Sequence, residues 1–240
     1  MKKIREGTNK LLAELSVLSI ELIIILILFV ASVFGFVYLT NFIFKLENTG
    51  FDTNVFKSVL PLINKTNTSI MVFVSFFASQ NFLLPANIAV AVYFLFIDKH
   101  KWYSIKIPVV ALGSFAVMSG LKIIFHRTRP LDPVFEAARG FSYPSGHAMS
   151  AMTFYGLLIY IVWDKVKNNT LKWILAILLL ITVFLIGFSR VYLRVHYASD
   201  VLAGFSLGIV WLVISLWAIS EVEKYTKRKI SLSINEQAGA

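Results

Sequence analysis

Long apolar stretches separated by short polar segments dominate the pattern of this sequence. They run from about Val17 to Phe44, Ser104 to Phe125, Met149 to Trp163, Ile174 to Phe188 and Ala198 to Ile219. A transmembrane helix needs roughly 20 mostly apolar residues, and each stretch reaches that length once a few flanking residues join the helix. The pattern therefore predicts a helical protein that crosses a membrane several times.

One further apolar stretch, from Ser69 to Ile97, is too long for a single straight span. Ser79-Gln80-Asn81 and Pro85 interrupt it, and such residues are typical of helix breaks. We interpret it as an interfacial or re-entrant piece followed by one span, from about Phe82 to Ile97. Two crossings would instead place several lysines on the outer side, against the positive-inside rule. These lysines are Lys99, Lys101, Lys165, Lys167 and Lys172.

The resulting topology has six spans, with both ends of the chain in the cytoplasm. The expected fold class is all-α, a polytopic bundle that forms a single integral membrane domain over residues 1–240. Within it we expect a cytoplasmic N-terminal segment at residues 1–16, an outer connecting segment at 45–68 and a cytoplasmic tail at 221–240. This arrangement brings three polar stretches near span ends to the same outer face, where they can share a site.

Composition supports this fold class and narrows the partners. The 240 residues are 58% hydrophobic with a mean hydropathy of +0.75, which is too apolar for a soluble domain. The net charge of +10 could indicate nucleic acid, but the basic residues fall mainly between apolar stretches, as they do in cytoplasmic loops. We therefore expect membrane lipids, and no nucleic acid, as partners. The absence of cysteine excludes disulfides and thiolate metal sites.

The first polar stretch contains Lys122 and Arg129, which are seven residues apart. If the helix continues to Pro130, these two cations share one face and together suit an anion. The competing interpretation is that both reach toward lipid headgroups, as basic residues near span ends commonly do. His126 and Arg127 are weaker candidates because their angular positions on such a helix differ.

The second polar stretch is Tyr143-Pro144-Ser145-Gly146-His147, directly before an apolar helix. Proline and small residues favour a helix N-terminus with exposed backbone N–H groups, an arrangement that binds phosphate. Ser145 adds a hydroxyl donor, Gly146 permits close approach of the backbone, and His147 lies within one turn. The competing interpretation is an ordinary helix start with a surface histidine.

The third polar stretch carries Arg190, His196 and Asp200. Arg190 offers a two-pronged donor for phosphate oxygens. If the residues after Arg194 are helical, His196 and Asp200 share one face, where the carboxylate can hold one ring nitrogen and leave the other free. A histidine held in this way is a candidate nucleophile or base. The competing interpretation is a buried ion-pair network that pins two spans, and Arg194 is interpreted as structural.

Together these spacings resemble the three signature motifs of the type 2 phosphatidic acid phosphatase superfamily, and every motif position is filled. They read Lys122-x6-Arg129-Pro130, Pro144-Ser145-Gly146-His147 and Ser189-Arg190-x5-His196-x3-Asp200. The resemblance covers about the last two thirds of the chain and implies the six-span plan of the membrane-bound lipid phosphatases. It also implies a helical core related to that of the soluble vanadium haloperoxidases, which hold vanadate in an equivalent pocket.

The resemblance implies hydrolysis of a phosphate ester or pyrophosphate through a phosphohistidine, with no cofactor and no metal ion. His196 would be the nucleophile oriented by Asp200, and His147 would protonate the leaving oxygen and then activate water. A cation in contact with phosphate supplies about 4 kcal/mol at an effective dielectric constant near 20, so several cations and a helix end can replace a metal. The residues expected to bind phosphate are Lys122, Arg129, Ser145, Gly146 and Arg190.

We therefore expect an enzyme of a bacterial inner membrane that hydrolyses a lipid phosphate or lipid pyrophosphate at the outer face. Phosphatidylglycerol phosphate, phosphatidate, undecaprenyl pyrophosphate and lipid A 1-phosphate all carry an outward phosphate on an apolar anchor, and the motifs do not separate them. The alternatives are a catalytically silent lipid-binding or transport protein on the same helices and, less favoured, a vanadate-dependent haloperoxidase. The presence of His147, His196 and Asp200 together favours the enzyme.

Overall fold

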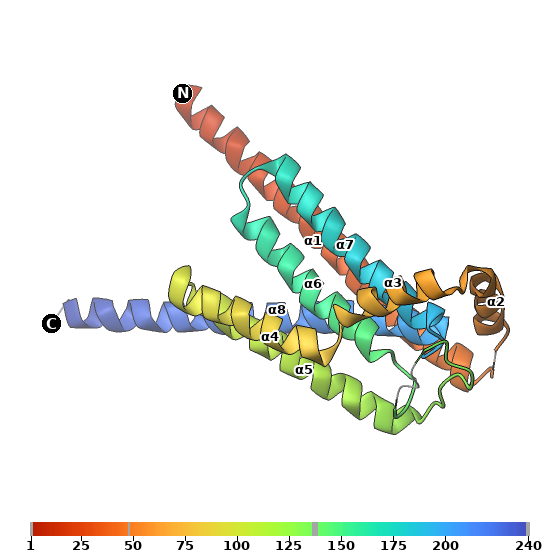
Figure 1. Ribbon diagram of the computed structural model, residues 1–240. Coiled ribbons are helices and arrows are strands. Elements are labelled where there is room, and N and C mark those ends of the chain that lie inside the picture. Colours follow the sequence, from red (N-terminus) through yellow and green to blue (C-terminus); the bar gives the residue numbers. More distant parts are fainter. Residues whose placement is uncertain (1, 48, 136–138, 239–240) are drawn as a thin grey trace.

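The computed structural model describes residues 2–47, 49–135 and 139–238, and all regular structure in these ranges is helical (Figure 1). The elements in chain order are α1 (Lys2–Phe44), α2 (Gly50–Val59), the short 3₁₀ helix η1 (Leu60–Leu62), α3 (Lys65–Phe76), α4 (Gln80–Val92), the π-helical turn η2 (Tyr93–Ile97), α5 (Lys101–Phe125), α6 (Gly146–Lys165), α7 (Asn169–Tyr192) and α8 (Ala198–Ala238).

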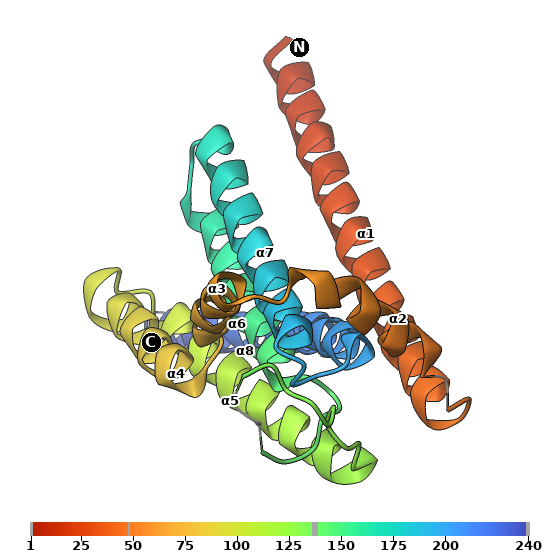
Figure 2. The same cartoon turned by 45° about the vertical axis from the view of Figure 1, so that its right-hand side comes forward.

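Six helical stretches of the described residues are long and apolar enough to cross a membrane, which confirms the all-α, six-span fold class. They are Leu22–Phe44, Lys65–Ile97, Lys101–Phe125, Gly146–Lys165, Asn169–Tyr192 and Ala198–Ser231. Half of the most apolar stretch of α6 is buried against other helices, compared with 6% of that of α1. α6 is therefore central to the bundle, with α7 at its side, whereas α1 is peripheral (Figures 1 and 2). Most of the large apolar side chains of α1 are exposed, as expected of a helix that faces lipid.

Two glycines allow α8 to pack closely on α6. A Cβ atom at Gly204 would lie 2.7 Å from the carbonyl oxygen of Ser145, and one at Gly208 would lie 2.7 Å from the Cβ of Met152. Both distances are too short for a side chain, so these small residues set how near the two helices come. The N-termini of α6 and α8 meet as a result, and the Ser145 N–H donates to the carbonyl of Asp200 at 3.0 Å.

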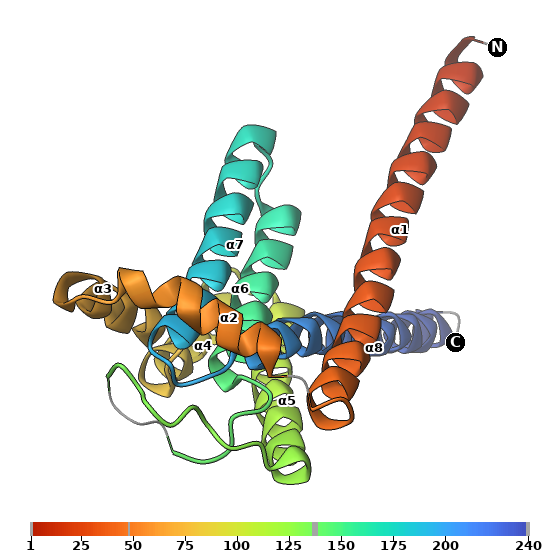
Figure 3. The same ribbon diagram turned by 90° about the vertical axis from the view of Figure 1, so that its right-hand side faces the viewer.

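The segment between the first span and α4 covers one end of the bundle. Figure 3 shows α2 and α3 lying across the end of α7, not parallel to it. The hydroxyl of Tyr192, at the end of α7, lies 3.2 Å from that of Thr68 and accepts from the Asn64 N–H at 3.3 Å. α2 and α3 are thereby fixed to the end of the bundle where the three polar stretches converge.

The predicted interruptions between Ser69 and Ile97 are only partly found. The chain breaks at residues 77–79, between α3 and α4 and next to the expected Ser79-Gln80-Asn81. The break expected at Pro85 is wrong, because Pro85 lies inside α4. A proline in a helix loses one backbone hydrogen bond, and neighbouring helices make this tolerable in membrane proteins.

The first and last helices are longer than the apolar pattern indicates. α1 begins at Lys2, not near Val17, and α8 continues to Ala238, well beyond Ile219. Beyond the apolar part of α8, Glu221 pairs with Lys224 and Glu223 pairs with Lys227, each at 2.7 Å. Such pairs one helical turn apart stabilise a helix in water, where apolar periodicity gives no signal.

Candidate active site

The three polar stretches meet at one cavity of about 500 Å³ at the α2–α3 end of the bundle. Its polar end is lined by Lys122, Arg129, Gly146, His147, Arg190 and His196. Of the other expected site residues, Asp200 lies directly behind His196 and is fully buried. Ser145 is also fully buried and does not line the cavity.

Lys122 and Arg129 reach the cavity together, but not on one helical face as expected. α5 ends at Phe125, and His126 adopts a left-handed backbone conformation with φ of 48°. The His126 N–H still bonds to the Lys122 carbonyl at 3.2 Å, after which the chain turns away and carries Arg129 on a loop. Lys122 Nζ donates to the carbonyl of Phe141 at 2.6 Å, which ties the helix to that loop.

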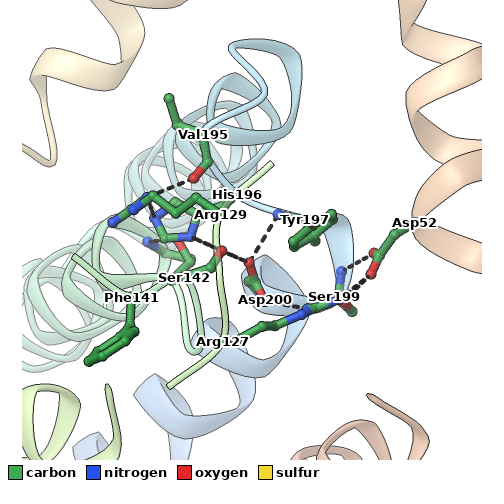
Figure 4. A network of polar contacts seen from close by, with 12 residues as sticks. Asp52, Arg127, Arg129, Phe141, Ser142, Val195, His196, Tyr197, Ser199 and Asp200 are labelled. Atoms are coloured by element: carbon green, nitrogen blue, oxygen red, sulfur yellow. Dashed lines mark hydrogen bonds and ion pairs between the residues drawn. The ribbon is translucent and has the colours of Figure 1, made fainter. Parts of the chain in front are cut away.

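Arg129 makes direct contact with the imidazole of His196. Its Nη1 atom donates to the Val195 carbonyl at 2.6 Å and lies 3.1 Å from Nε2 of His196 (Figure 4). A guanidinium can only donate hydrogen bonds, so Nε2 must be the accepting nitrogen and the ring proton belongs on Nδ1. The unprotonated nitrogen of His196 therefore faces the cavity.

His196 and Asp200 form the expected pair by a different local structure. α8 begins at Ala198, so His196 precedes the helix and lies in a turn after α7. Arg194 has a φ of 52°, and the N–H groups of Val195 and His196 both point to the Arg190 carbonyl, at 3.2 and 3.3 Å. This turn brings Nδ1 of His196 to 3.5 Å from Oδ2 of Asp200.

The imidazole of His196 is held neutral. Burial lowers the pKa of His196 to about 4, Arg129 and Arg190 also lower it, and the hydrogen bond and charge of Asp200 raise it only in part. The contact with Asp200 is consequently that of a neutral N–H with a carboxylate. A neutral, oriented imidazole with one unprotonated nitrogen has the form that a nucleophile requires.

The second stretch begins α6 as predicted, and Ser145 is the N-cap residue of that helix. Its hydroxyl caps the helix by accepting the Ala148 N–H at 3.5 Å. Gly146 and His147, the first two residues of α6, line the cavity. A Cβ atom at Gly146 would lie 2.5 Å from Sδ of Met118, so the glycine lets α5 approach the start of α6.

Arg190 enters the cavity from the last turn of α7 and is oriented by α3. Its Nη1 donates to the hydroxyl of Ser75 at 2.5 Å, and both residues are buried. Ser75 lies in a stretch whose fold the sequence leaves ambiguous, and a single serine in an apolar run carries no signal of such a contact.

Four further polar residues surround the pair, and sequence reasoning either missed them or ranked them low. Ser142 donates to Oδ2 of Asp200 and lies 3.4 Å from Nδ1 of His196. Arg127 donates to Oδ1 of Asp200 at 2.5 Å and to Asp52 at 2.8 Å, and the hydroxyl of Ser199 contacts Arg127 and Asp52 (Figure 4). Burial alone lowers the pKa of Arg127, but the two carboxylates outweigh it, so the pKa is raised.

The fold and the site together define the class of protein. A model of the PAP2 superfamily matches residues 103–224, a range that includes all three polar stretches. The chain belongs to this superfamily and is a phosphoric ester hydrolase of the integral membrane type.

Individual relatives agree with this class. Phosphatidylglycerophosphatase B of Bacillus subtilis (strain 168) is 30% identical over 154 residues, 62% of this chain and 72% of that protein. Undecaprenyl-diphosphatase of Sulfolobus acidocaldarius is 27% identical over 188 residues, 74% of this chain and 84% of that protein.

Solved structures share the fold. The crystal structure of the transmembrane PAP2 type phosphatidylglycerolphosphate phosphatase from Bacillus subtilis matches with a TM-score of 0.74 and 25% identity, covering 81% of this chain and 96% of that one. The LpxE structure from Aquifex aeolicus matches with a TM-score of 0.55 and 22% identity, over 68% and 93% of the two chains. The latter likeness concerns the fold alone.

Proposed function

We propose that the protein hydrolyses a lipid phosphate or lipid diphosphate at the outer face of the membrane, through a phosphohistidine on His196. The observation that carries this proposal is the cavity itself. It joins a cationic end, where His196 lines the cavity and its Nε2 contacts Arg129, to an apolar wall within the bundle.

The cationic end suits a phosphate group. Lys122, Arg129 and Arg190 line it from α5, the following loop and α7. The first N–H groups of a helix lack acceptors within that helix, so the start of α6 at Gly146 adds further donors. These groups supply the charge neutralisation that attack on a phosphate dianion requires.

The apolar wall suits an acyl or prenyl chain. α4, α5 and α6 contribute Leu83, Leu84, Leu112, Phe115, Met118, Phe154 and Leu157. Leu84 and Leu112 are 63% and 68% exposed although they line the cavity, so the cavity reaches the lipid-facing surface between α4 and α5. A lipid can therefore present its phosphate to His196 while its tail remains in an apolar environment.

The proposed reaction has two steps. Nε2 of His196 attacks phosphorus, the bond from phosphorus to the lipid oxygen breaks, and His147 donates its proton to that oxygen. His147 then takes a proton from water, whose oxygen attacks the phosphohistidine and releases inorganic phosphate and neutral His196. Asp200 stabilises the positive charge that the His196 ring acquires on attack.

The proposed sidedness follows from the distribution of lysines. Five lysines lie in or beside the two turns at the end of the bundle opposite the cavity: Lys99, Lys101, Lys165, Lys167 and Lys172. The positive-inside rule places that end in the cytoplasm and the cavity outside. With this orientation residues 1–16 and 221–240 are cytoplasmic, residues 45–68 are the outer connection, and the whole chain is one domain, which we place in a bacterial inner membrane.

The relatives favour two substrates for this cavity. Phosphatidylglycerol phosphate and undecaprenyl diphosphate are the substrates that the names of the similar proteins indicate. Phosphatidate and lipid A 1-phosphate have the same chemistry and belong in the comparison. Release of phosphate by the purified protein from each of these four lipids identifies the preferred one.

The test of the proposal is to trap the phosphoenzyme. Brief incubation with substrate labelled in the scissile phosphate, followed by an alkaline quench, should leave acid-labile label on the wild type. His196→Ala should carry no label and show no turnover while it inserts in the membrane as the wild type does. Label that persists on His196→Ala would refute the assignment of His196 as the nucleophile.

A further inference from the structure

Asp52 is a buried carboxylate that lies outside the three motifs and outside the cavity. It belongs to α2, in the connection between the first two spans, and is 3% exposed. A carboxylate is rarely buried to this extent unless partners compensate for the lost water. Asp52 has three such hydrogen bonds, and each of them leads toward Asp200 (Figure 4).

The first route runs through Arg127. Its Nη2 donates to Oδ2 of Asp52 at 2.8 Å, and its Nη1 donates to Oδ1 of Asp200 at 2.5 Å. One planar guanidinium thus joins the two carboxylates, and its position is further fixed because it stacks on the ring of Tyr197 at 4.1 Å. A rigid fork of this kind transmits position, since neither carboxylate can shift without displacing it.

The second route runs through the first turn of α8. Oδ1 of Asp52 accepts the Ser199 N–H at 2.9 Å, and Oδ2 accepts the Ser199 hydroxyl at 2.6 Å. The same hydroxyl accepts from Nη1 of Arg127 at 2.8 Å. Asp52 therefore caps the helix that carries Asp200, from another part of the chain, and a carboxylate at a helix N-terminus is stabilising.

We propose that Asp52 is a positioning residue of the phosphatase: through Arg127 and Ser199 it fixes the carboxylate of Asp200, and thereby the imidazole of His196, for attack on phosphorus. This inference rests on the proposed function of His196. It extends the active site to α2, a helix with no motif of its own.

The charge of Asp52 matters as well as its place. The groups that face His196 and Asp200 are the cations Lys122, Arg129 and Arg190, the imidazole of His147, and Arg127. If Asp52 were neutral, Arg127 would pair with Asp200 alone and would draw its negative charge away from Nδ1 of His196. Because Arg127 pairs with Asp52 as well as with Asp200, the negative charge of Asp200 is only partly neutralised. That charge can then stabilise the His196 imidazolium that forms during attack.

The decisive variant is Asp52→Asn, which keeps the shape of the side chain and removes its charge. We expect kcat to fall by about 10- to 100-fold, the size found when the outer partner of a functional histidine is removed in metal sites. KM should stay unchanged, because no residue of the cationic end is altered. Asp52→Glu, which restores the charge, should recover part of kcat.

The control is Asp98→Asn. Asp98 also accepts from one cation, Lys165 at 2.8 Å, but at the opposite end of the bundle. Its loss should leave both kcat and KM at the wild-type values. A fall equal to that of Asp52→Asn would show a general effect of lost ion pairs and would overturn the proposal.

A double-mutant cycle with Asp200→Asn separates positioning from a structural role. If Asp52 acts through Asp200, then Asp52→Asn should have no further effect on kcat once Asp200 is neutral. Equal fold-losses in both backgrounds, or a raised KM with unchanged kcat, would contradict the proposal. If Asp52→Asn does not fold, Ser199→Ala is tested in its place. Ser199→Ala should lower kcat in the wild-type background but not in the Asp200→Asn background. An unchanged kcat in the wild-type background would overturn the proposal.

This experiment can fail independently of the proposed function. Absence of label on the wild type in the trapping experiment would refute the phosphohistidine. Coupling between Asp52 and Asp200 is measured on turnover and would still be detected. Conversely, label on His196 with no coupling would refute the positioning role alone.

Discussion

The two ends of the helical bundle both bury charged side chains, but they balance those charges differently. At the end opposite the cavity, Lys106 is 4% exposed, and its Nζ donates to the Tyr160 hydroxyl at 3.1 Å and lies 3.5 Å from Glu223. Tyr103 donates to Asp164 there at 2.7 Å. Lys106 is thus paired with a hydroxyl and a carboxylate, and Tyr103 with a carboxylate.

At the cavity end, positive charge exceeds negative charge around an open volume. Lys122, Arg129 and Arg190 line the cavity and donate mainly to neutral oxygens of the loop, the turn after α7 and Ser75. The two carboxylates nearby are joined to each other by Arg127. Ionic groups at membrane depth that are balanced hold helices together, whereas an unbalanced cluster beside a cavity is arranged for a ligand of opposite charge.

The largest effect on activity is expected when a cation is removed from the cavity. Arg129→Ala and Arg190→Ala should each lower kcat/KM by on the order of 10²- to 10³-fold, the loss typical of one donor that stabilises a transition state. Vanadate, whose five-coordinate form resembles that state, should inhibit the wild type competitively and each variant more weakly.

Lys165→Ala is the control for these variants, since Lys165 lies at the opposite end and pairs with Asp98. It should leave vanadate inhibition as in the wild type. Unaltered inhibition in both arginine variants would mean that these side chains do not bind the phosphate.

At the opposite end, removal of one charged side chain should lower the stability of the protein and leave its activity unchanged. Glu223→Gln leaves the ammonium of Lys106 buried without a carboxylate and should cost about 3 kcal/mol of unfolding free energy. Lys106→Met should cost less, because Glu223 retains Lys227 at 2.7 Å. Thermal unfolding in detergent measures the stability of both variants, and turnover per folded molecule should equal that of the wild type.

No change in activity is expected when divalent metal ions are removed. In the proposed site, the cations of the cavity and the start of α6 supply the charge that a metal would otherwise provide. Phosphate release should therefore be unchanged by EDTA. Full inhibition by EDTA that Mg²⁺ restores would show that phosphate is bound in another way.

The last test leaves activity untouched and asks on which side each end lies. Leu131, in the loop at the cavity end, is 93% exposed, and Lys167 is exposed in the turn between α6 and α7. Because the chain has no cysteine, Leu131→Cys should react with an impermeant maleimide in intact cells or spheroplasts, and Lys167→Cys only after lysis. The reverse pattern would place hydrolysis on the cytoplasmic leaflet.

Much of the fold was predictable because a membrane restricts the structures that a chain can form. A stretch of apolar residues in lipid must satisfy its backbone hydrogen bonds internally, so it becomes a helix. The six spans and the convergence of the three polar stretches follow from that rule and from the placement of lysines. Helix ends were less predictable, as α1 and α8 show, because water-exposed turns lack apolar periodicity.

The sequence by itself determined the candidate groups for binding and cleaving a phosphate ester. Lys122, Arg129, His147, Arg190, His196 and Asp200 are all recognisable from residue type and spacing. Only the tertiary structure decided how they meet. Arg129 and His196 lie in turns and not on the expected helical faces, and their mutual contact spans 67 positions of the chain. Asp52, Ser75 and Ser142 have no spacing that relates them to the motifs. Their roles arise because packing of α2, α3 and the loop before α6 excludes water, and each buried polar group must then find a partner wherever the fold supplies one.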